Sequence, residues 1–215
     1  MSRRAKFLLV SLAVVALAGT PLVAQVDPVQ QVSAPTIVVL DASYSMSLPV
    51  GEGRTRQSVL VDALEDELGS IHSSASTSFA LVVFEDEGEI GIHVRHPASA
   101  EAVIQTSREV VPWGTSPIAE AVAFALLYAR TIAPSGSARL LLVTDGEDYA
   151  QFLNGPAEPP AQLLSPRMTL SLLTLEETRP GVSEALEGWV RRSGGELLTV
   201  TQEGARSSRT TPART

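Results

Sequence analysis

The chain has 215 residues, no cysteine, 44% hydrophobic residues and a formal net charge of −8. These values suit one globular domain with a packed core, exclude a disulfide-stapled scaffold and give no support for a second domain. The negative charge also makes nucleic acid and anionic membrane surfaces unsuitable partners.

The first 24 residues have the layout of a secretory signal peptide. Basic residues at positions 3, 4 and 6 precede an apolar stretch from Phe7 to Ala18, and cleavage after Ala18 or after Ala24 fits the small residues that follow. The uncharged run continues to Val26, so an uncleaved N-terminal membrane anchor is the alternative. Both versions export the rest of the chain, to the periplasm or the exterior, either free or tethered. Without the leader, 13 of the 16 basic residues remain against 24 acidic ones, a net charge of −11.

Alternating apolar segments predict strands and helices along the remaining chain. Residues 25–34 are predicted to be a linker, and residues 202–215 a disordered polar tail. Ser116 is predicted to be the N-cap of a buried helix that begins at Pro117. Strands are predicted at residues 36–40, 78–84, 89–94, 138–145, 168–175 and 195–200, and helices at 58–71, 99–109, 116–131 and 182–193.

Strands that are apolar on both faces and alternate with helices indicate a doubly wound α/β fold. The predicted central sheet is mostly parallel, with helices on both faces and one antiparallel hairpin strand, residues 89–94, after the acidic turn EDEG. In such sheets, ligands bind beyond the carboxyl ends of the strands, where the order of connection reverses.

Two of the predicted strands end in an aspartate, Asp41 and Asp145, so both carboxylates should lie at one edge of the sheet. A divalent cation would relieve their mutual repulsion, because hard oxygen ligands suit Mg²⁺, Ca²⁺ or Mn²⁺. Ser43 and Ser45 follow Asp41 at alternate positions and can direct two hydroxyls to the same side. The sequence therefore predicts a cation site at this edge.

Three motifs resemble the metal-ion-dependent adhesion site of von Willebrand factor type A domains. They are DxSxS after a buried strand, GT before a buried helix and TDG after a later strand, in the order of that family. The resemblance implies a Rossmann-like domain over residues 35–201, a Mg²⁺ ion, with Ca²⁺ or Mn²⁺ as alternatives, and an acidic side chain of a protein partner as the last ligand. One departure is Tyr44, where the family most often has glycine. By resemblance the metal ligands are Asp41, Ser43, Ser45, Thr115 and Asp145.

The resulting hypothesis is an exported protein-binding module without catalytic activity. One alternative is a metal-dependent phosphohydrolase with Asp41 as nucleophile, but Ser43 occupies the position where such an enzyme usually has a second carboxylate, and Lys6 is the only lysine. A second alternative is a structural subunit of a bacterial envelope assembly with a vestigial metal site.

Other polar and aromatic residues are weaker candidates. His93 and His96 are three apart on a predicted strand and should point to opposite faces, which disfavours a shared metal. The acidic turn at residues 85–89 is predicted to be solvated, and His72 to lie at the surface. Trp189 is predicted to be a core residue, whereas core and exposed positions fit Trp113 equally.

Overall fold

The computed structural model describes residues 34–51, 53–71, 77–86, 90–133, 136–147, 167–176, 180–201 and 206–210. All of them belong to the unit that runs from Val32 to Thr215. The predicted leader with both cleavage positions, His72 and most of the predicted irregular stretch after Asp145 lie outside the described residues.

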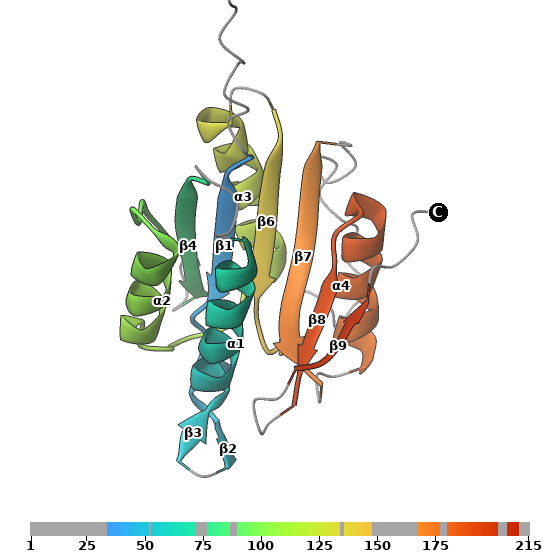
Figure 1. Cartoon of the computed structure of the whole chain (residues 1–215). Helices are drawn as coiled ribbons and strands as arrows, with labels where there is room; N and C mark the ends of the chain where they lie inside the picture. Colours follow the sequence, from blue (N-terminus) through green and yellow to red (C-terminus); the bar gives the residue numbers. More distant parts are fainter. Residues whose placement is uncertain are drawn as a thin grey trace, which may run out of the picture. The chain divides into compact units, whose positions relative to one another are not determined.

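In the described part of the chain, seven strands form one twisted sheet in the order β5-β4-β1-β6-β7-β8-β9 (Figure 1). Strands β4, β1, β6, β7 and β8 run parallel, whereas β5 pairs antiparallel with β4 and β9 pairs antiparallel with β8. The predicted mostly parallel sheet and its hairpin are confirmed. The strands are β1 Thr36–Asp41, β4 Phe79–Asp86, β5 Ile90–Arg95, β6 Ala138–Val143, β7 Met168–Leu175, β8 Leu197–Val200 and β9 Arg206–Thr210.

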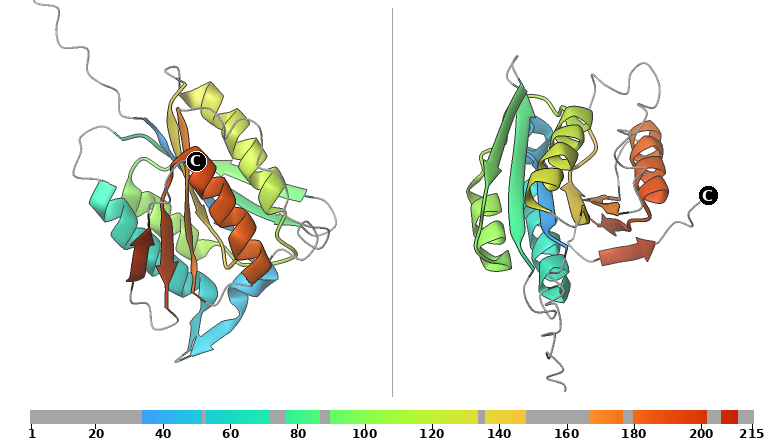
Figure 2. Two further views of the ribbon diagram at one scale, coloured as in Figure 1. Left: turned by 90° about the vertical axis from the view of Figure 1, so that its right-hand side faces the viewer. Right: turned by 90° about the horizontal axis from the view of Figure 1, so that it is seen from above.

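Among the described residues, helices α1 to α4 cover the two faces of the sheet (Figure 2). Helices α1 and α2 pack on the face that includes Val38 and Leu40, and α3 and α4 pack on the face that includes Ile37 and Val39. Alternate side chains of β1 therefore enter different cores, as expected for a central strand that is apolar on both faces. Trp189 of α4 is fully buried, as predicted. The helices are α1 Arg56–Ile71, α2 Ala100–Glu109, α3 Ile118–Ile132 and α4 Pro180–Ser193.

The carboxyl ends of β1 and β6 lie side by side at the point of the sheet where the strand order reverses. From β1 the chain crosses through α1 to β4 on one side, and β6, which follows α3, lies on the other side of β1. Leu40 pairs with Val143 in the parallel register. Asp41 is therefore level with Thr144, and Asp145 follows at the same rim.

Several boundaries differ from those predicted. Between β1 and α1 the chain forms a 3₁₀ turn, η1 (Tyr44–Ser47), and a two-stranded ribbon of β2 (Pro49–Gly51) and β3 (Arg54–Thr55), none of which was predicted. Helix α1 accordingly begins two residues before Ser58. The prediction that Ser116 caps α3 is wrong: Pro117 is the N-cap residue, and it makes no side-chain cap bond.

The prediction of a disordered tail over residues 202–215 is wrong for Arg206–Thr210, which form β9. This strand pairs through its backbone with the edge of β8, for instance Leu198 with Arg209. Its polar composition gives no hydrophobic pattern, so only the partner strand reveals it. Within the described segments, no helix is both long and apolar enough to cross a membrane.

Candidate functional site

Asp41 is the last residue of β1, and its side chain is fully buried. Its Oδ1 accepts a hydrogen bond from the Ser43 backbone N–H at 2.8 Å. Its Oδ2 accepts from the hydroxyls of Ser116 at 2.7 Å and Thr144 at 2.6 Å. These bonds fix the carboxylate at the rim, saturate Oδ2 and leave one lone pair of Oδ1 for a further ligand.

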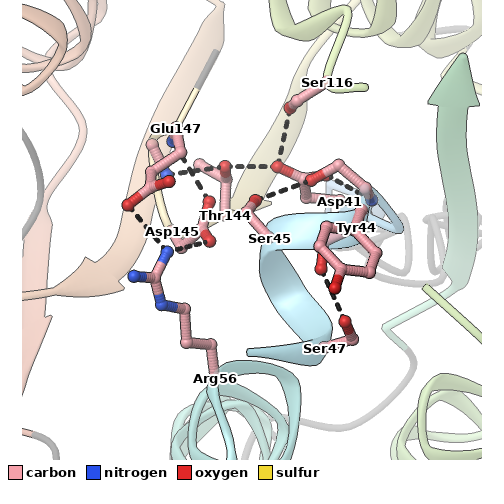
Figure 3. Close-up of polar contacts among 11 residues, drawn as sticks. Asp41, Tyr44, Ser45, Ser47, Arg56, Ser116, Thr144, Asp145 and Glu147 are labelled. Carbon is pink, nitrogen blue, oxygen red and sulfur yellow. Dashed lines mark hydrogen bonds and ion pairs between the residues drawn. The ribbon is translucent and has the colours of Figure 1, made fainter. Parts of the chain in front are cut away.

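The hydroxyls of Ser43 and Ser45 lie 3.0 Å apart (Figure 3). Ser43 is the N-cap residue of η1, and its hydroxyl does not cap that turn. The tight turn brings the two side chains to one side, next to Asp41, as the alternate spacing predicted. The two hydroxyls form a hydrogen bond with each other, and the Ser43 side chain also interacts with the Asp41 carboxylate.

Asp145 belongs to an ionic cluster beside these hydroxyls (Figure 3). Arg56 Nη1 lies 2.8 Å from Asp145 Oδ2 and 2.8 Å from Glu147 Oε1. The other carboxylate oxygen, Oδ1, accepts from the Glu147 backbone N–H at 3.1 Å. The Asp145 side chain is only 1% exposed. Its charge is therefore balanced by an arginine that belongs to the start of α1.

Burial raises the pKa of Asp41 to about 6, from an ordinary value of 3.8, and the negative charge of Asp145 adds to this effect. The hydrogen bonds from Thr144, Ser116 and Ser43 act in the opposite direction, because they stabilise the ionised form. A positive charge at the rim would favour ionised Asp41. The electrostatics of this edge therefore favour a bound cation.

Thr115 lies at the rim on a neighbouring segment, and its side chain is exposed. Backbone hydrogen bonds hold this segment against the strand end: Tyr44 N–H donates to the Gly114 carbonyl at 2.9 Å, and Trp113 N–H donates to the Ala42 carbonyl at 2.5 Å. No described hydrogen bond joins the Thr115 hydroxyl to the other predicted ligands. The adjacent Ser116, not Thr115, contacts Asp41.

Four described side chains of the site were not predicted as metal ligands: Ser116, Thr144, Arg56 and Glu147. Ser116 and Thr144 bind the Asp41 carboxylate, and Arg56 pairs with Asp145. The parallel register could have indicated Thr144, because it precedes Asp145 and is level with Asp41. No local pattern marks Arg56, which is 89 residues from Asp145 in the sequence.

Large apolar side chains are exposed around this edge. Tyr44 is 57% exposed, Trp113 is 56% exposed and Val111 is 78% exposed. Trp113 is thus an exposed residue, which resolves the two interpretations left open by the sequence. Tyr44 and Trp113 belong to the two segments that the backbone hydrogen bonds join at the end of β1.

The two described histidines contact different residues. His93 Nε2 lies 3.7 Å from Glu85 Oε1, and His96 lies 3.0 Å from the Tyr128 hydroxyl. That the two histidines do not share a metal stays a prediction. The acidic turn lies partly outside the described residues.

The rim suits a small, hard divalent ion. Within the described residues no group of three or more His, Cys, Asp or Glu side chains could hold a metal, so an ion here would depend on hydroxyl oxygens. Neighbouring ligands of an octahedral Mg²⁺ are about 2.9 Å apart, close to the 3.0 Å between the Ser43 and Ser45 hydroxyls. The donor set, with Asp41 beside these hydroxyls, therefore fits Mg²⁺.

Comparison with protein families identifies the von Willebrand factor type A domain over residues 36–147, half of the chain. The chain belongs to the von Willebrand factor type A family. The matched region contains β1, β6 and all the side chains of the rim described above. Domains of this family commonly mediate protein–protein interactions. Comparison with curated proteins gives no significant sequence match.

Solved structures confirm the fold of this type A domain. A von Willebrand factor type A protein from Catenulispora acidiphila matches with a TM-score of 0.52 and 19% identity, over 78% of this chain and 38% of that one. An aerotolerance-related membrane protein from Bacteroides fragilis matches with a TM-score of 0.52 and 14% identity, over 78% and 91%. The PilB minor pilin of Streptococcus sanguinis matches with a TM-score of 0.51 and 13% identity, over 83% and 60%. The chain thus spans well under half of the first protein.

Proposed function

We propose that this type A domain captures an acidic side chain of a partner protein through a divalent cation, with Mg²⁺ the best candidate and Ca²⁺ or Mn²⁺ as alternatives. The main observation behind the proposal is that the Ser43 and Ser45 hydroxyls lie 3.0 Å apart beside the buried carboxylate of Asp41. When bound, the ion supplies positive charge with an open coordination position for the partner carboxylate.

Each proposed ligand would contribute differently to binding that ion. Ser43 and Ser45 provide neutral hydroxyl ligands, which leave the ion strongly electrophilic. Asp41 contributes Oδ1, directly or through water, because Oδ2 already accepts two hydrogen bonds. Thr115 and Asp145 complete the proposed ligand set from the two neighbouring segments.

The exposed apolar side chains at the same rim support a protein partner. Tyr44 and Trp113 combine a large apolar surface with a polar group, and aromatic residues of this kind are enriched in protein interfaces. Both belong to the segments that meet at the end of β1, the edge where the ion is proposed to bind. An acidic residue of the partner that has apolar neighbours would suit this surface, whereas a nucleic acid would not suit a chain with a net charge of −8.

We further propose that the domain acts outside the cytoplasm, in the periplasm, in the medium or tethered at the N-terminus. The support is the basic and then apolar leader at residues 1–24. The similarity to an aerotolerance-related membrane protein and to a minor pilin fits this setting. No catalytic step is proposed for the domain.

The test is Mg²⁺ titration by isothermal calorimetry. Ser43→Ala combined with Ser45→Ala should weaken Mg²⁺ binding by tenfold or more. Ser47→Ala is the matched control, since this serine lies in the same turn and its hydroxyl donates to the Tyr44 carbonyl instead. Wild type that binds no divalent ion, or a double variant that binds as wild type does, would refute the site.

Partner capture gives the second readout. The immobilised domain should retain its partner from an envelope extract in Mg²⁺ and release it in EDTA, and the serine double variant should retain nothing in either buffer. Retention that EDTA does not change would exclude capture through the ion.

A structural role without a metal is the second candidate function. The observation that favours it is the ion pair between Arg56 and Asp145, which balances one rim carboxylate with a side chain of the protein itself. In that case neither Mg²⁺ nor EDTA would change the melting temperature of the wild-type protein.

A further inference from the structure

Arg56 occupies one carboxylate oxygen of Asp145, which is one of the proposed ligands of the ion. It is the first residue of α1, directly after β3, so the ribbon and the helix fix its backbone. Its Nη1 contacts Asp145 Oδ2 and Glu147 Oε1, each at 2.8 Å. The arginine side chain is 22% exposed, so solvent screens these contacts only in part.

The ion pair between Arg56 and Asp145 stabilises the fold when no ion is bound. Asp145 is 1% exposed, and a buried carboxylate without a counter-charge is strongly destabilising. Its Oδ1 already accepts the Glu147 backbone N–H. Arg56 contacts the other oxygen, Oδ2. Its positive charge thus takes the place that the ion would have next to Asp145 according to the family motif.

The same nitrogen of Arg56, Nη1, forms a second ion pair, with the carboxylate of Glu147. If the guanidinium left Asp145, its contact with Glu147 could remain, since Glu147 is 20% exposed and has its own oxygen at 2.8 Å. The cluster thus has two arrangements of one cation between two carboxylates. A divalent ion that approached Asp145 would repel the guanidinium and favour the arrangement with Glu147.

We propose that Arg56 is an internal counter-cation that competes with the divalent ion for Asp145 and thereby sets the ion affinity of the rim. The inference rests on the proposed function and adds a determinant of affinity to it. Arg56 stabilises the ion-free fold and weakens ion binding, and ion binding transfers Arg56 from Asp145 to Glu147.

The experiment compares three variants by Mg²⁺ calorimetry and by thermal unfolding in EDTA. Arg56→Gln removes the competing charge, so it should bind Mg²⁺ about tenfold more tightly than wild type. It should also melt at a lower temperature in EDTA, because Asp145 loses its counter-charge. Arg56→Lys keeps the charge and should remain near wild type in both measurements.

Arg54→Gln is the matched control. Arg54 lies two residues away, carries the same charge and pairs with exposed Asp62 at 2.6 Å. It should leave Mg²⁺ affinity and the melting temperature in EDTA close to wild type, which separates a local effect at Asp145 from a change in net charge.

The outcomes separate this inference from the proposed function. If wild type binds Mg²⁺ and Arg56→Gln binds it no more tightly than Arg54→Gln does, the competition is refuted and the ion site stands. If Arg56→Gln binds Mg²⁺ and wild type does not, the competition is supported and ion-dependent capture by the wild type is refuted. If no variant binds a divalent ion, both are refuted.

Discussion

At the scale of single residues, Asp41 links the pH to the stability of the ion-free protein. Its pKa in the folded chain is about 6, against an ordinary value of 3.8, chiefly because the side chain is buried. The folded protein therefore binds this proton more tightly than the unfolded chain does. The contribution of Asp41 to stability is greatest below pH 3.8, decreases as the pH rises and becomes constant above about pH 6.

We expect the free energy of unfolding to decrease by up to about 3 kcal/mol between pH 4 and pH 7 because of this one group. Urea unfolding in EDTA across this range measures the effect. Asp41→Asn has no titrating group at this position, so its stability should depend less on pH. Equal slopes for the two proteins would contradict the prediction.

Some residues of the site are close together in the sequence, and others are brought together only by the fold. Asp41, Ser43 and Ser45 are close in the sequence, and a short turn is enough to bring them together. Ser116 and Arg56 reach the rim through the packing of elements that are distant in the chain. Their roles depend on where α1 and α3 begin. Helix α1 begins two residues before its predicted start at Ser58, and α3 begins one residue after its predicted start at Pro117.

At the scale of elements, continuous apolar runs predicted the strands well, because buried parallel strands need apolar side chains on both faces. The strand at residues 168–175 has the predicted bounds, whereas β6 ends at Val143 and not at Asp145. Beyond Val143, the Thr144 N–H still donates to the Leu173 carbonyl of β7, and the side chains of Thr144 and Asp145 form hydrogen bonds at the rim. The ribbon of β2 and β3 was missed because three and two residues are too few for a periodic pattern.

The turn between α4 and β8 gives a prediction at the same scale. A Cβ atom on Gly195 would lie 1.9 Å from the Leu170 carbonyl oxygen of β7, a contact that only a backbone shift can relieve. Gly195→Ala should destabilise the domain by about 3 kcal/mol, at the upper end of the usual cost of overpacking. Chemical denaturation measures this change.

Gly188 in the middle of α4 is the control for that substitution. A Cβ atom there would meet only the flexible end of Arg192, at 3.7 Å. Gly188→Ala should therefore stabilise the domain by up to about 1 kcal/mol through helix propensity. A neutral Gly195→Ala would show that this turn tolerates a side chain.

At the scale of the whole molecule, β9 extends the sheet by one antiparallel strand at the edge beside β8. Without it, β8 would present unpaired backbone groups, and an open edge promotes aggregation. A chain that ends at Thr201 should melt at a lower temperature and lose amide-exchange protection in β8. A chain that ends at Thr210 keeps β9 and should behave as the full chain does, and equal stability of both truncations would contradict the role of β9.

The two tryptophans of the chain give this domain two separate optical reporters. Trp189 of α4 is fully buried, whereas Trp113 is 56% exposed on a segment at the rim. Acrylamide should quench the emission of Trp113 and spare that of Trp189. An occupant of the rim should shift the emission of Trp113 to shorter wavelength and protect it from the quencher. Trp113→Phe should leave only the blue emission of the core, which reports unfolding and is insensitive to what binds at the rim.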